Sequence, residues 1–107
     1  MLAAVIDIWA PKALWIEAFR EAGILDLFSG LFFSSDHGIV KPSPKPFESI
    51  LSMIKASADE SIMIGDSPRR DLGGARNAGI DCILVGGAEH PDAFMCLDSL
   101  LDFCELV

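Results

Sequence analysis

Short apolar runs alternate with helical stripes along this chain, and this alternation constrains the fold more than any other feature. The expected strands cover residues 2–8, 31–33, 61–64 and 80–85. Segments with apolar residues at helical spacing separate these runs, and one more follows, over residues 97–104. Because such alternation builds βαβ units, the sequence predicts an α/β fold with a largely parallel sheet. Continuous apolar runs also predict strands buried on both faces.

The composition is that of one small folded domain. The chain has 107 residues, of which 51% are hydrophobic, so we expect residues 1–107 to form a single domain. The formal net charge of −8 argues against nucleic acid and against an anionic membrane surface as partners. The first apolar run is too short to span a bilayer. Three cysteines without a Cys-x-x-Cys pair suit a reducing compartment, so we expect a cytoplasmic protein.

Two acidic residues follow the third expected strand. Gly65 is expected to permit a tight turn there, with Asp66 at the strand end and Asp71 in the next helical turn. Ligands of parallel α/β sheets bind at the carboxyl ends of strands, and Mg²⁺ prefers one or two carboxylates completed by water and phosphate. The segment therefore predicts a magnesium site, with Asp66 binding directly and Asp71 through water. The alternative is a helix N-cap at Asp66 and a dipole-stabilising charge at Asp71.

A lysine in a proline-rich loop is the second candidate. Lys41 precedes Pro42, and the rigid ring restricts how the lysine approaches a site. Its ammonium group could hold a phosphoryl oxygen and offset nearby carboxylates. The alternative is a solvated surface lysine, which suits Lys45 better than Lys41.

These segments together resemble the haloacid dehalogenase-like hydrolase superfamily. The likeness covers residues 21–87 and includes GILDLF at 23–28, SSDHGIVKPSPKPF at 34–47, IGDS at 64–67 and GARNAGI at 74–80. The resemblance implies a Rossmann-like three-layer α/β/α core and Mg²⁺-dependent hydrolysis of small phosphorylated substrates through an aspartyl-phosphate. It also implies that Lys41 steadies the nucleophile and the phosphate, while Asp66 and Asp71 hold the metal.

The first family motif is absent. No Asp-x-Asp-Gly follows a strand, and residues 3–8 align with the second core strand of the family rather than the first. We therefore expect a truncated core without a cap domain, which is incomplete or inactive as an isolated chain. Three outcomes are then open: a homodimer or a partner chain completes the sheet, the two halves of the sheet close up directly, or the chain is a fragment that does not fold well alone. A non-catalytic module that binds phosphate or another protein is the alternative function.

A second alignment makes residues 3–8 the first core strand. Asp7 would then be the nucleophile and Ser34 the phosphate-binding hydroxyl. Trp9 would replace the second aspartate of the motif, as an aromatic residue does in the dehalogenating branch, so dehalogenation belongs to this alignment only. Residues 23–47 match the later region of the family better, which favours the first alignment.

Overall fold

The computed structural model describes residues 1–107, which divide into two compact units. Unit 1 comprises residues 1–40 and 45–56, and unit 2 comprises residues 41–44 and 57–107. Every paired strand is parallel to its neighbour, and each unit holds one sheet. The predicted α/β class with parallel strands is therefore confirmed. None of the helices combines the length and the apolar character needed to cross a bilayer.

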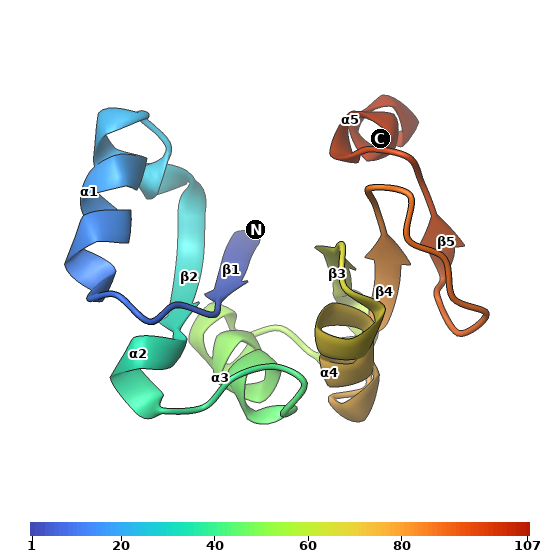
Figure 1. Cartoon of the computed structure of the whole chain (residues 1–107), viewed down its shortest axis with the longest axis horizontal. Coiled ribbons are helices and arrows are strands. Elements are labelled where there is room, and N and C mark those ends of the chain that lie inside the picture. Colours follow the sequence, from blue (N-terminus) through green and yellow to red (C-terminus); the bar gives the residue numbers. More distant parts are fainter. The chain divides into compact units, whose positions relative to one another are not determined.

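Unit 1 is a two-stranded sheet with helices. Its elements are β1 (Leu2–Ile6), α1 (Lys12–Glu21), a 3₁₀ turn (Leu25–Leu27), β2 (Phe28–Phe33), α2 (Ser34–His37) and α3 (Lys45–Ile54) (Figure 1). β1 and β2 pair from Leu2 opposite Phe28 to Ile6 opposite Phe33. α3 packs on both strands. A Cβ built on Gly30 of β2 would lie 3.2 Å from Ile54 Cγ2, so this glycine lets the helix approach closely.

Two predictions for unit 1 need correction. The first strand ends at Ile6 rather than at residue 8. None of its residues is fully buried, whereas three residues of β2, its only partner strand, are buried. α1 forms as predicted, and Gly23 follows it with φ +73°. The helix buries none of its residues. Phe19 contacts Phe28, with ring centroids 5.3 Å apart.

Unit 2 is a three-stranded sheet in the order β3-β4-β5. Its elements are a 3₁₀ turn (Ala58–Glu60), β3 (Ile62–Gly65), a π-helical turn (Pro68–Leu72), α4 (Gly73–Asn77), β4 (Asp81–Leu84), β5 (Met95–Cys96) and α5 (Leu100–Leu106) (Figure 1). β4 is the central strand and runs parallel to both neighbours. The apolar core of this unit consists of Leu72, Ala75, Ile80, Cys82, Ile83 and Leu84.

The end of unit 2 differs from the prediction. β5 spans only two residues, too few to produce an apolar period, and was not predicted. The last helix begins at Leu100 rather than at residue 97. Ser99 is its N-cap: its hydroxyl accepts from the Asp102 N–H, and the Asp102 carboxylate accepts from the Ser99 N–H. This reciprocal pair stops the helix from extending toward Leu97.

The buried thiol of Cys82 should be inert. Its exposure is 1%, and burial, with a smaller contribution from the negative charge of Asp71, raises its pKa to about 11. The thiolate is the reactive form, so an aromatic disulfide reagent at pH 8 should modify the exposed Cys96 and Cys104 first. Cys82 should react only after a denaturant is added. Equal rates for all three thiols in the native protein would contradict this expectation.

Candidate active site

The turn after β3 begins with an exposed aspartate. Asp66 directly follows the strand and is exposed at its carboxyl end. The N-cap of the π-helical turn is Ser67, whose hydroxyl accepts from the Arg70 N–H at 3.1 Å. Pro68 occupies the first helical position, where no donor is needed. The alternative of a helix N-cap at Asp66 is therefore wrong, because the neighbouring serine caps this helix.

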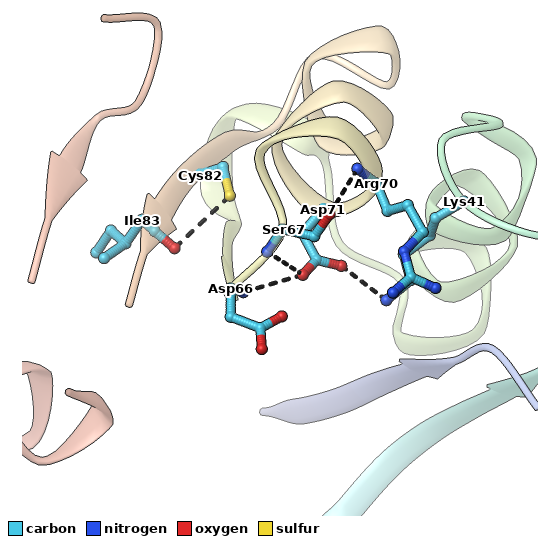
Figure 2. A network of polar contacts seen from close by, with 7 residues as sticks. All are labelled: Lys41, Asp66, Ser67, Arg70, Asp71, Cys82 and Ile83. Atoms are coloured by element: carbon cyan, nitrogen blue, oxygen red, sulfur yellow. Dashed lines mark hydrogen bonds and ion pairs between the residues drawn. The ribbon is translucent and has the colours of Figure 1, made fainter. Parts of the chain in front are cut away.

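Asp71 is buried beneath this turn. The residue is 5% exposed, and its Oδ2 accepts from the N–H groups of Asp66 at 3.0 Å and Ser67 at 3.1 Å (Figure 2). Hydrogen bonds to an ionised acceptor are about twice as strong as neutral ones. Asp71 therefore stabilises the turn through these two hydrogen bonds. The alternative of a surface charge that only complements a helix dipole is wrong, because the residue is buried.

Lys41 binds the second oxygen of this carboxylate. Its Nζ donates to Asp71 Oδ1 at 2.7 Å, and the two side chains are only 13% and 7% exposed. The alternative of a solvated lysine is wrong for Lys41, whereas Lys45 is exposed at the start of α3. The predicted proximity of the lysine to an acid of this segment is thus confirmed within unit 2.

The segment that carries Lys41 has its own contacts in unit 2. The Lys41–Pro42 peptide bond is cis. The carbonyl of Pro42 accepts from Asn77 Nδ2 at 3.5 Å, and a Cβ built on Gly73 would lie 3.6 Å from Pro42 Cβ. Helix α4 therefore contacts Pro42, the residue that follows the lysine. Sequence reasoning missed the role of Asn77, since a polar residue on a helix face carries no signal for a contact 35 residues away.

Gly65 has a role different from the one predicted. Its backbone is not in the left-handed region, so a tight turn does not explain the glycine. A Cβ built on it would lie 2.3 Å from Asp71 Oδ2 and 2.5 Å from Asp71 Cγ. The glycine is required because the carboxylate occupies the space of its missing side chain.

The exposed carboxylate of Asp66 fits a hard cation. Figure 2 draws no interaction between it and the Asp71 carboxylate. No group of three or more acidic, histidine or cysteine side chains that could hold a metal forms in the structure. A cation at Asp66 would therefore take most of its ligands from water and from a phosphate group, which is the binding mode that Mg²⁺ favours.

The two remaining predicted site residues, Asp7 and Ser34, lie in unit 1. Ser34 is 3% exposed; its Oγ accepts from the Ile8 N–H at 2.7 Å and donates to the Ile8 carbonyl at 3.0 Å. Its single hydroxyl proton is therefore already used by the backbone. Asp7 follows β1, and its Oδ2 is buried. Lys41, Asp66 and Asp71 thus belong to unit 2, while these two residues belong to the other unit.

Comparisons with known proteins point to one family. Residues 39–95 match the family model described as HAD-hydrolase-like. Over 76 residues the chain is 35% identical to phosphoserine phosphatase of Thermus thermophilus. The matched region covers 71% of this chain and 30% of that protein. Over 73 residues it is 36% identical to pyrophosphatase PpaX of Halalkalibacterium halodurans. That matched region covers 68% of this chain and 34% of that protein. The chain spans about a third of the length of these curated relatives.

A solved structure supports the fold. The HAD-hydrolase YfnB of Bacillus subtilis, whose structure is described as bound to magnesium, superposes with a TM-score of 0.82 at 23% sequence identity. The match covers 97% of this chain and 47% of that chain. At this identity the likeness concerns the fold, which is the Rossmann-like core that the sequence resemblance implies.

Proposed function

Because the chain belongs to the haloacid dehalogenase-like hydrolase family, we propose that Lys41, Asp66 and Asp71 are the cation- and phosphate-holding part of a magnesium-dependent phosphate-ester hydrolase. One observation carries the proposal. The buried ion pair between Lys41 Nζ and Asp71 Oδ1, at 2.7 Å, is joined to the exposed Asp66 at the carboxyl end of β3 by the backbone hydrogen bonds of Asp71. Ligand sites of parallel α/β sheets lie at such strand ends.

Each residue has a distinct part in this proposal. Asp66 would hold the cation directly, and Asp71 would act on it only through water. When bound, Mg²⁺ would neutralise charge on the phosphoryl oxygens and orient them. Lys41 would supply a second positive charge to the same phosphate. A chain with a net charge of −8 needs such local positive charge to bind an anion.

The proposed substrate class is a small phosphorylated molecule. The names of the two curated relatives describe enzymes that act on phosphoserine and pyrophosphate, and both substrates carry a phosphoryl group. The proposed reaction passes through an aspartyl-phosphate, which requires an aspartate nucleophile. Asp7 is one proposed source of this nucleophile, and a second chain that pairs as a homodimer or partner and completes the sheet is another.

Hydrolysis of p-nitrophenyl phosphate tests the enzyme proposal. We expect any turnover by the chain to depend on Mg²⁺ and to be lost in Asp66→Asn, because the cation loses its charged ligand. Loss in Asp7→Asn as well would assign the nucleophile to Asp7. No turnover by the wild type, together with stable self-association in sedimentation experiments, would instead favour the non-catalytic interaction module.

The affinity for Mg²⁺ tests the site without turnover. Changing a residue that supports a metal ligand costs about 10–100-fold in metal affinity. Asp66→Asn removes the charged ligand itself, so it should abolish measurable Mg²⁺ binding. Asp81→Asn is the matched control, because Asp81 is also exposed but begins β4, at the opposite edge of the same parallel sheet. Isothermal titration calorimetry should separate the two variants. Equal affinities would remove Asp66 from the site.

A further inference from the structure

We propose that Gly65 and Asp71 act as a positioning pair: the absent side chain of Gly65 leaves room for the Asp71 carboxylate, which then holds Lys41 and the backbone of Asp66 in one arrangement. This inference rests on the proposed function and deepens it. It makes Asp71 a positioning residue instead of a group that needs the cation. It also names Gly65 as the residue on which that position depends.

The hydrogen bonds of Asp71 are the first argument. Oδ2 already accepts two backbone N–H groups, from Asp66 and Ser67. Oδ1 accepts from Lys41 Nζ. Three protein donors therefore satisfy a carboxylate that is 7% exposed at its side chain. A buried carboxylate with this many donors is stable without a metal.

The space at Gly65 is the second argument. A Cβ at this position would overlap Asp71 Oδ2, Cβ and Cγ, at 2.3, 2.5 and 2.5 Å. Contacts of this length do not occur, so either the strand end or the carboxylate must move. The Asp71 carboxylate accepts hydrogen bonds from the N–H groups of Asp66 and Ser67, the two residues that follow Gly65. Displacing it therefore breaks the hydrogen bonds that orient Asp66, and with them the contact to Lys41.

Through these contacts, Asp71 connects the end of strand β3 with Lys41. Gly65 belongs to β3 and pairs with Leu84, a fully buried residue of β4. Asp71 reaches from the π-helical turn back to the end of this strand, and its other oxygen holds Lys41 from a loop 30 residues earlier. The Asp71 carboxylate therefore fixes the positions of both the Lys41 amine and the backbone of Asp66.

The test compares Gly65→Ala with Gly73→Ala in the full chain. Gly73 also lacks a left-handed backbone, and a Cβ there would make only ordinary contacts of 3.6 and 3.8 Å. In metal-free buffer, hydrogen exchange of the Asp66 and Ser67 amides should accelerate about tenfold to a hundredfold in Gly65→Ala, as expected for lost hydrogen bonds to a charged acceptor. Gly73→Ala should leave these two rates unchanged. Equal behaviour of the two variants would overturn the proposal.

A second variant keeps the test decisive if Gly65→Ala does not fold. Asp71→Asn has nearly the same shape but loses the charge, so it should accelerate exchange at both amides while the amides of β4 stay protected. With Mg²⁺, Asp71→Asn should weaken binding about 10–100-fold, whereas Asp66→Asn should abolish it without changing exchange at Ser67.

Unchanged exchange in Asp71→Asn would contradict the positioning pair. Loss of Mg²⁺ binding in Asp71→Asn as complete as in Asp66→Asn, with the exchange rates unaffected, would make Asp71 a ligand instead. If the wild type binds no Mg²⁺ at all, the proposed function fails, while the metal-free exchange comparison still decides the inference.

Discussion

Asp71→Ala is expected to lower the free energy of unfolding of unit 2 by about 3–5 kcal/mol, since removal of one partner leaves a buried charge uncompensated. The Lys41 side chain is only 13% exposed, and the N–H groups of Asp66 and Ser67 also lose their acceptor. Both tryptophans of the chain, Trp9 and Trp15, lie in unit 1. The measurement must therefore follow amides of β4 by NMR during urea denaturation, because tryptophan fluorescence reports on the other unit.

Two further variants complete this experiment. Asp92→Ala is the control, because its ion pair with Arg76 is 3.8 Å long and about half exposed on both sides, so we expect a change within about 0.5 kcal/mol. Adding Lys41→Met to Asp71→Ala should recover part of the lost stability, since the orphaned charge is then removed as well. A loss below about 1 kcal/mol for Asp71→Ala would show that the ion pair is a solvated surface contact.

Leu84→Ala should destabilise the core of unit 2 by about 2–5 kcal/mol, the range for a fully buried leucine. Leu84 is 0% exposed and lies on the central strand, where it pairs with Gly65 on one side and Cys96 on the other. The cavity would open next to the strand end that carries the site. Urea denaturation followed by the amides of Ile83 and its neighbours measures the effect.

Leu101→Ala is the control for this core variant. Leu101 is 72% exposed on α5, so its removal should change stability by no more than about 0.5 kcal/mol. Equal effects of the two substitutions would mean that β4 is not the centre of the apolar core of unit 2.

The elements that were predictable are those with enough length to show a period. Helix α3 has Phe47 and Ile50 at helical spacing, and both are buried as that pattern requires. Strand β5 has two residues, so no periodicity could identify it. The burial of β1 was overestimated because an apolar run predicts a strand but not how well its faces are covered: β1 has no fully buried residue, whereas β2, in the same two-stranded sheet, has three.

The charged residues of the site could be predicted from the sequence, but the contacts that hold them in place could not. Asp66 and Asp71 stood out because they follow an expected strand, and Lys41 stood out because it precedes a proline in a polar loop. The capping role of Ser67 was missed, although the Ser-Pro pair at the start of a helix is a readable signal. The reason for Gly65 is a contact with a side chain six positions later, which requires the three-dimensional path of the turn.

Titration of the ¹⁵N-labelled chain with Mg²⁺, followed by inorganic phosphate, tests the central claim most directly. The account predicts saturable shifts of amide signals over residues 65–71 with Mg²⁺, further shifts at Lys41 when phosphate is added, and neither response in Asp66→Asn. An unchanged spectrum of residues 65–71 at millimolar Mg²⁺, with or without phosphate, would contradict the account.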